Sequence, residues 1–156
     1  MSERVKFELD GIEVEAAPGE TIWQVAKREG TRIPHLCHLD EPGYRPDGNC
    51  RACMVEIEGE RVLAASCIRT PSEGMKVRTS SERAKKSREI VFELLLSDQP
   101  ERDAAHDPNS RFWEWVDDMG VEPVSRFPRR EPVKADSTHT AIAVNLDACI
   151  NCNLCV

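Results

Sequence analysis

The chain has 156 residues, of which 31% are charged and 40% hydrophobic, and its formal net charge is −7. This acidic balance argues against nucleic acid as a partner, because binding phosphates requires a basic surface. No run approaches the roughly 18 apolar residues of a membrane span, and the N-terminus has no apolar signal segment, so we expect a cytoplasmic protein without a membrane span.

The first part of the chain has the pattern of a β-hairpin followed by a short helix. Apolar and polar residues alternate on both sides of Asp10-Gly11, which predicts a hairpin with one buried face. Thr21 and Gln24 have the spacing of a capping box and are followed by a helical stripe of apolar residues. These signals predict a helix over residues 21–29.

A long loop and further strands follow. Residues 31–49 contain three prolines and two glycines, which neither a helix nor a central strand would tolerate. Alternation resumes after this loop and predicts three short strands, over residues 54–58, 62–65 and 75–77. A hairpin, a crossing helix, a long loop and further strands together favour an α+β fold with a β-grasp-like sheet.

Two more helices are predicted after the sheet. Thr79 and Glu82 have the spacing of a second capping box, and the helix that they begin ends near Ser97. Apolar residues at i, i+3, i+4 and i+7 spacing predict another helix over residues 110–119.

The chain divides into four expected parts. The sheet comes first, the two helices form a small helical segment, and a stretch rich in proline and arginine indicates an extended linker. The last part is the expected start of a further domain. The expected boundaries are 1–79, 80–120, 121–138 and 139–156.

Cysteines are the strongest functional signal. The chain has seven of them, and in a protein without an export signal they indicate metal ligands or redox groups rather than disulfides, since the cytosol keeps thiols reduced. Four lie in the long loop, at its exit and after the next predicted hairpin: Cys37, Cys50, Cys53 and Cys67.

Four thiolates that converge from a loop and a neighbouring turn are the ligand set of a [2Fe–2S] cluster. Gly43, Gly48 and Ala52 are small residues that would let backbone N–H groups approach the sulfides. Tetrahedral zinc is an alternative, and it would make the chain a zinc-binding interaction module without a redox role. Buried free thiols are the other alternative.

The remaining cysteines, Cys149, Cys152 and Cys155, form C-x2-C-x2-C, the opening of the bacterial ferredoxin run. The fourth cysteine of that run would lie beyond Val156, and in two-cluster ferredoxins it serves the other cluster. We therefore expect the start of a [4Fe–4S] ferredoxin-like domain whose fourth ligand lies beyond the chain end, in a chain that is the N-terminal piece of a larger subunit.

The run CRACMVEIEG and the cysteine of LAASC resemble a known family. They are similar to the N-terminal [2Fe–2S] domain shared by large cluster-bearing subunits of respiratory complex I, iron-only hydrogenases and NAD-linked formate dehydrogenases. The resemblance implies a β-grasp ferredoxin fold, and the family's four ligands match Cys37, Cys50, Cys53 and Cys67. The gap after Cys37 is longer here than in the family.

Several of these subunits next carry a [4Fe–4S] cluster on one histidine and three cysteines. The matching positions in this chain are Gln99, Asp103, His106 and Phe112. An amide, a carboxylate, one imidazole and a phenyl ring cannot replace that ligand set, so we expect no cluster in this segment. We expect His106 to lie in a surface turn.

The segments LLLSDQP, AHDPNSRFWEW, SRFP and AVNLDACINCNLCV resemble the alpha subunit of NAD-dependent formate dehydrogenase. This resemblance implies a molybdenum or tungsten bis-molybdopterin guanine dinucleotide site in the remainder of the alpha subunit. It also implies a partner iron–sulfur subunit that binds FMN and NAD.

On that hypothesis the chain relays electrons from formate oxidation, as part of an oxidoreductase, and has no catalytic residues of its own. The sequence has no G-x-S-x-G, H-E-x-x-H or Walker motif, as a relay requires none. The alternative within the same redox class is the equivalent segment of an NAD-linked hydrogenase or complex I-type subunit.

Overall fold

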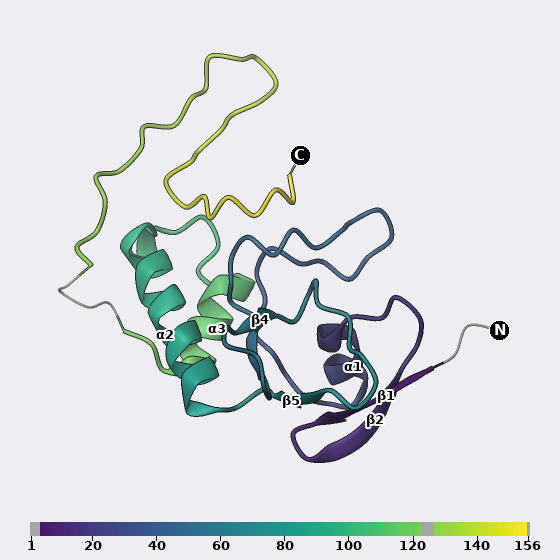
Figure 1. The fold of residues 1–156 in the computed structure, drawn as a ribbon. Helices are drawn as coiled ribbons and strands as arrows, with labels where there is room; N and C mark the ends of the chain where they lie inside the picture. Colours follow the sequence, from purple (N-terminus) through teal and green to yellow (C-terminus); the bar gives the residue numbers. More distant parts are fainter. Residues whose placement is uncertain (1–3, 123–126, 156) are drawn as a thin grey trace.

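The computed structural model describes residues 4–122 and 127–155 (Figure 1). Its first part is a mixed sheet, and its helices follow in the chain. The elements in order are β1 (Val5–Leu9), β2 (Ile12–Ala16), α1 (Ile22–Arg28), β3 (Met54–Ile57), β4 (Ala64–Ala65), β5 (Lys76–Arg78), α2 (Glu82–Ser97), the 3-10 turn η1 (Arg102–Ala104) and α3 (Arg111–Met119).

The strands form one sheet in the order β2-β1-β5-β3-β4. β1 runs parallel to β5, whereas the other neighbouring pairs are antiparallel. Buried residues of the strands and of α1 form the first core, which includes Phe7, Val25, Val55 and Val77. The predicted α+β fold is confirmed.

Helix α1 begins as its sequence predicts. Thr21 is the N-cap, its hydroxyl accepts from the backbone N–H of Gln24, and the Gln24 side chain accepts from the backbone N–H of Thr21. This reciprocal capping satisfies two backbone donors that the first turn leaves free. Gly30 follows the helix at φ +80°, a left-handed conformation that costs glycine little.

The second capping box was predicted at the wrong residue. The N-cap of α2 is Ser81, whose hydroxyl accepts from the N–H of Ala84. Thr79 instead donates its backbone N–H and its hydroxyl to the carboxylate of Asp10, over 2.7 and 2.6 Å. Because these long-range bonds hold Thr79 at the end of the sheet, the helix begins two residues later.

Two strands also differ from prediction. The strand expected over residues 62–65 is reduced to Ala64–Ala65, which pair with Val55 and Met54 of β3. The last strand is shifted by one residue, to Lys76–Arg78. Pairing between strands, which local alternation does not report, sets these limits.

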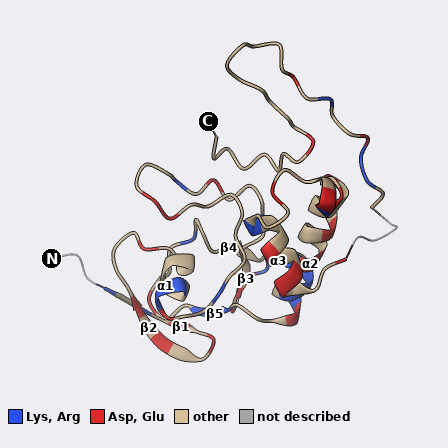
Figure 2. Cartoon of the chain, turned by 180° about the vertical axis from the view of Figure 1, so that it is seen from behind, with Lys and Arg blue, Asp and Glu red and all other residues tan. Residues whose placement is uncertain are grey.

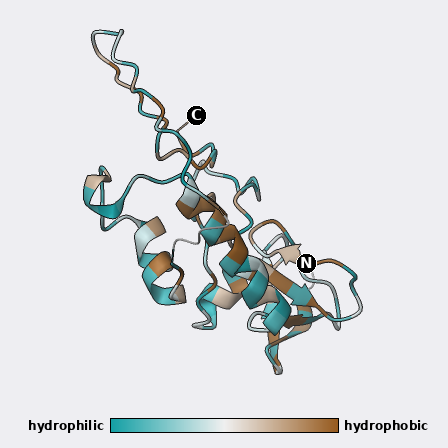
Figure 3. Ribbon diagram, turned by 90° about the vertical axis from the view of Figure 1, so that its left-hand side faces the viewer, coloured by the Kyte–Doolittle hydropathy of each residue, from teal (hydrophilic) through white to brown (hydrophobic). Residues whose placement is uncertain are grey.

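A second core joins α2 and α3 to the cysteine loop. Phe92 of α2 is fully buried and stacks on Phe112 of α3, with ring centroids 5.9 Å apart. The same cluster of buried residues includes Cys37 and Cys50. Figure 3 shows hydrophobic and hydrophilic stretches alternating along the helices. The helical segment therefore packs directly on the loop that carries the first cysteines.

The predicted linker has little regular structure where it is described. Its backbone forms one isolated bridge, between Asp136 and Val144. Pro123 and Arg126 of this stretch lie outside the described residues. Figure 1 shows the chain running away from α3 and returning, so that its last residues lie near the loop before β3.

Charged residues of both signs are mixed along the described elements (Figure 2). No helix in the described part of the chain is long and apolar enough to cross a membrane.

Candidate metal centre

Four cysteines from separate parts of the chain meet beneath the surface. They are 1%, 8%, 1% and 1% exposed, in the order Cys37, Cys50, Cys53 and Cys67. The side chain of Cys37 acts on the ionisation of Cys50 and Cys67, and that of Cys67 acts on the ionisation of Cys53. The fold thus brings together all four residues that the spacing singled out.

The thiols perturb one another's ionisation. The pKa of Cys37 is held far below its ordinary value of 9.0, chiefly by hydrogen bonds from the side chains of Cys50 and then Cys67. The same contacts raise the pKa values of Cys50 and Cys67. A hydrogen bond with Cys67 lowers the pKa of Cys53 to about 7. Thiolates are the form that binds metals, and a lowered thiol pKa favours that form.

Backbone groups also face the sulfurs. The N–H of Cys37 donates to Sγ of Cys50, and the N–H of Cys50 donates to Sγ of Cys37, each over 3.5 Å. Such N–H groups stabilise negative charge on sulfur, and hydrogen bonds of this kind tune cluster potentials.

The backbone near Cys50 takes left-handed conformations. Gly48 lies at φ +66° and Arg51 at φ +58°. A Cβ on Gly48 would come within 2.9 Å of the Ile68 side chain, next to Cys67, so glycine allows these two segments to approach. Ala52 is fully buried. Gly43 also has a positive φ, but a Cβ there would meet nothing within 4 Å.

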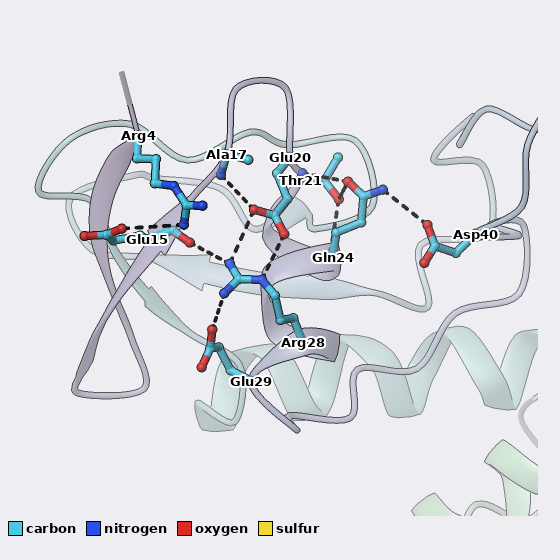
Figure 4. A network of polar contacts seen from close by, with 9 residues as sticks. All are labelled: Arg4, Glu15, Ala17, Glu20, Thr21, Gln24, Arg28, Glu29 and Asp40. Carbon is cyan, nitrogen blue, oxygen red and sulfur yellow. Dashed lines mark hydrogen bonds and ion pairs between the residues drawn. The ribbon is translucent and has the colours of Figure 1, made fainter. Parts of the chain in front are cut away.

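Helix α1 holds the start of the loop in place. Gln24 donates to one carboxylate oxygen of Asp40 over 3.2 Å, and Lys27 pairs with the other over 2.9 Å. Figure 4 shows the bond from Gln24 to Asp40 beside the capping box of α1. The indole N–H of Trp23 donates to the carbonyl of Ile33 over 3.2 Å. These bonds fix the chain on both sides of Cys37.

Sequence reasoning did not single out His38, which follows Cys37. Its ring is 3% exposed and packs edge-on against Trp23, with centroids 4.6 Å apart. Among the described residues, neither ring nitrogen has a hydrogen-bond partner. The sequence gives no sign that His38 is buried, because its ring packs on Trp23 of α1, which is distant in the sequence.

The donor set fits an iron–sulfur cluster. Four buried sulfurs are the soft ligands that [2Fe–2S] clusters use, and zinc accepts the same set. Within the described residues, no group of three or more His, Cys, Asp or Glu side chains is arranged to hold a metal ion. A [2Fe–2S] cluster has two irons, so Cys37, Cys50, Cys53 and Cys67 would not need to converge on one ion to hold it.

The second set of cysteines lies near the first. Cys149 and Cys155 are exposed and Cys152 is partly buried. The N–H of Asn151 donates to Sγ of Cys149 over 3.4 Å. Asn49 donates to the carbonyl of Asn151, and Asn153 donates to the carboxylate of Asp47. The C-terminal segment therefore lies against the loop that leads to Cys50.

The four positions where related subunits carry another cluster are spread over different environments. Gln99 is buried and donates to the carbonyl of Ala148, whereas Phe112 belongs to the second core. Asp103 lies exposed in η1. His106 is exposed, in agreement with the expected surface position, and its Nε2 lies 3.0 Å from the Asn145 side-chain nitrogen.

Comparison with known proteins gives one family. Residues 2–82 match the family described as "2Fe-2S iron-sulfur cluster binding domain".

Similar proteins are subunits of larger oxidoreductases. The chain is 32% identical over 161 residues to the mitochondrial NADH-ubiquinone oxidoreductase 78 kDa subunit of Candida albicans, covering 97% of this chain and 21% of that protein. It is 40% identical over 96 residues to a subunit of the NADH-quinone oxidoreductase of Rickettsia typhi, covering 62% of this chain and 14% of that protein. The chain thus spans a small part of the length of the curated relatives that it matches.

A solved structure resembles nearly the whole chain. A chain in the crystal structure of NAD+-reducing [NiFe]-hydrogenase in the H2-reduced state superposes with a TM-score of 0.84 at 27% identity. The match covers 97% of this chain and 64% of that one.

Proposed function

The chain belongs to the 2Fe-2S iron-sulfur cluster binding domain family, and from that premise we propose that Cys37, Cys50, Cys53 and Cys67 hold a [2Fe–2S] cluster that relays single electrons. One observation carries this assignment: all four thiols are buried, Cys37 and Cys50 exchange N–H···S bonds, and the carbonyl of Cys53 accepts from the N–H of Ser66, next to Cys67. When bound, such a cluster accepts and returns one electron at a time.

The protein's own groups prepare the site for that role. The low pKa of Cys37 supplies a thiolate, and the N–H groups of Cys37 and Cys50 face sulfur. Bonds from Gln24 and Lys27 to Asp40 connect the loop to α1. A rigid, largely buried set of ligands limits rearrangement when the charge changes, as an electron relay requires.

Metal and sulfide analysis tests this proposal. The protein, purified without oxygen, is expected to contain iron and acid-labile sulfide in equal amounts at this site, and dithionite is expected to produce the EPR signal of a reduced [2Fe–2S] cluster. A Cys149→Ser variant should retain that signal, because Cys149 is outside the proposed ligand set. A colourless sample that contains zinc would overturn the redox role and favour the interaction module.

We further propose that Cys149, Cys152 and Cys155 ligate a [4Fe–4S] cluster with a ligand from outside this sequence. The support is their C-x2-C-x2-C spacing and the bond from the N–H of Asn151 to Sγ of Cys149. A [4Fe–4S] EPR signal in the full-length subunit that disappears in Cys152→Ser would support this, and an unchanged signal would exclude it.

A third proposal concerns the enzyme to which this segment belongs. We propose the alpha subunit of an NAD-dependent formate dehydrogenase, with a molybdopterin site in the remainder of that subunit and an FMN- and NAD-binding partner. The likeness of LLLSDQP, AHDPNSRFWEW and AVNLDACINCNLCV to that group supports this assignment.

A complex I-type or hydrogenase-type subunit is the second candidate. It is favoured by the 97% coverage of this chain by both the Candida albicans subunit and the hydrogenase chain. Complexes isolated from the native host through a tag on this subunit distinguish the two. Formate-dependent NAD reduction with bound molybdenum or tungsten supports the first candidate, whereas hydrogen-dependent NAD reduction or NADH-dependent quinone reduction supports the second.

A further inference from the structure

Arg88 reaches from the middle of α2 toward the cysteine site. It is 7% exposed, in contrast to most charged residues of this helix. Its Nε donates to the carbonyl of Met54 over 2.9 Å, and its Nη2 donates to the carbonyl of Thr79. Met54 directly follows Cys53, so the guanidinium is bonded to the residue next to a proposed ligand.

The charge of Arg88 is buried without an acidic partner in contact. Among the described residues, its guanidinium forms no ion pair with a carboxylate, and its hydrogen bonds go to two neutral carbonyls. The negative charges that act on it are those of the Cys53 thiolate and, more weakly, Asp10. The Asp10 carboxylate is already bonded to the N–H and hydroxyl of Thr79.

A buried cation is costly unless nearby negative charge compensates it. Arginine stays protonated under such conditions, so the cost is not avoided by losing a proton. A cluster with four thiolate ligands would supply the missing negative charge on the Cys53 side of the site.

We propose that Arg88 is a positioning residue that sets the reduction potential of the [2Fe–2S] cluster, its fixed positive charge favouring the reduced state. This inference rests on the proposed function. Reduction adds one electron to the cluster and no proton is required, so the product carries one more negative charge. A fixed cation in a poorly solvated position stabilises that product more than it stabilises the oxidised cluster.

Three variants of the full chain separate charge from hydrogen bonding. Arg88→Gln removes the charge but keeps a donor for a carbonyl, whereas Arg88→Lys keeps the charge and loses the planar fork. Arg83→Gln is the matched control. It removes the same charge from the same helix, but at an exposed position. The readout is the midpoint potential, from a redox titration followed by the EPR signal of the reduced cluster.

In Arg88→Gln we expect the equilibrium constant for reduction to fall about tenfold, which is about 59 mV for a one-electron couple. The midpoint potential of Arg88→Lys is expected to stay close to that of the unmodified protein, and that of Arg83→Gln is expected to shift little. The shift in Arg88→Gln should persist at about 0.5 M salt, because salt screens exposed charges far more than buried ones.

Two results would overturn the inference while the proposed function stands. One is a midpoint potential in Arg88→Gln that equals that of Arg83→Gln. The other is a large negative shift of the midpoint potential in Arg88→Lys, because the charge is intact in that variant. This second result decides the question if Arg88→Gln fails to hold a cluster. If the unmodified protein contains no iron and sulfide, the proposed function itself fails.

Discussion

The backbone N–H of Cys37 donates to Sγ of Cys50 and that of Cys50 donates to Sγ of Cys37, although the two residues are 13 positions apart. This reciprocal contact closes the loop between them at its base. The loop contains Gly43 and Tyr44, which are exposed. The long gap after Cys37 therefore adds residues on the outside of the site without separating the two sulfurs.

Replacing Cys50 by serine is expected to prevent stable binding of the [2Fe–2S] cluster. The substitution replaces a soft sulfur ligand, which also accepts from the N–H of Cys37, by a harder hydroxyl oxygen. The iron and sulfide bound at this site should fall severalfold, and the EPR signal of the reduced [2Fe–2S] cluster should be lost. The measurement is iron and sulfide analysis with EPR on protein purified without oxygen.

Cys155→Ser is the control for the [2Fe–2S] EPR signal, because it also removes a thiol but one at an exposed position outside the four-cysteine set. A Cys50→Ser protein with the full [2Fe–2S] signal would show that Cys50 is not a ligand.

Phe92→Ala is expected to lower the free energy of unfolding by about 3 to 5 kcal/mol, the usual cost of removing a fully buried aromatic ring. Phe92 is 0% exposed and stacks on Phe112 in the core that includes Cys37 and Cys50. The cluster should also become easier to lose. Urea denaturation followed by circular dichroism, together with the rate of cluster bleaching, measures both effects.

Leu94→Ala on the same helix is the matched control, since Leu94 is 45% exposed. Its cost should stay below about 1 kcal/mol, because alanine favours the helix and little contact is lost. Equal costs at the two positions would contradict the assignment of Phe92 to this core.

Local signals predicted the parts of the fold that depend on near neighbours. The capping box at Thr21 formed because both of its partners lie within one turn. The same spacing at Thr79 did not form one, because Asp10, 69 positions away, binds both donors of Thr79. A spacing rule cannot see a competitor that only the sheet brings close.

The residues of the site also divide into those with a local sequence signal and those placed by long-range contacts. The four cysteines could be recognised from their spacing and from the small residues around them, and the structure places them together. Arg88 and His38 could not be recognised from the sequence, because burial of a charged or polar side chain depends on elements distant in sequence. Arginine in the middle of a helix with many charged residues looks like part of a solvated face.

Lys27→Met is expected to raise the pKa of Asp40 toward its ordinary value of 3.8. The side-chain bonds from Lys27 and then Gln24 hold that pKa down in the folded protein. A lowered pKa stabilises the fold above pH 3.8, and this contribution is lost as the pH falls through the folded value. Since the pair is on the surface, it contributes at most about 1 kcal/mol.

The check on Lys27→Met is an NMR titration of the Asp40 carboxyl carbon. Lys6→Met serves as the control, because Lys6 pairs with Glu13 and Glu15 on the hairpin instead. An unchanged pKa of Asp40 in Lys27→Met would show that the ion pair does not form in solution.

Arg129→Ala is expected to loosen the C-terminal segment that carries the last three cysteines. Arg129 donates to the carbonyl of Gln99 over 2.6 Å and to the carboxylate of Asp147 over 2.9 Å, so it ties the end of α2 to that segment. The pair is largely shielded, with side-chain exposures of 30% and 17%. Losing these charge-assisted bonds should cost about 1 to 2 kcal/mol, a five- to thirtyfold increase in local opening.

Hydrogen exchange of residues 139–155, measured by mass spectrometry, detects that opening. Arg78→Ala provides the comparison, because Arg78 also pairs with a carboxylate, that of Glu58, but lies on β5 and is 65% exposed. Its removal should leave exchange unchanged, whereas Asp147→Ala should reproduce the effect of Arg129→Ala. If exchange in Arg129→Ala equals that in Arg78→Ala, the segment is held by other contacts, and the bond from Asn153 to Asp47 is the next to test.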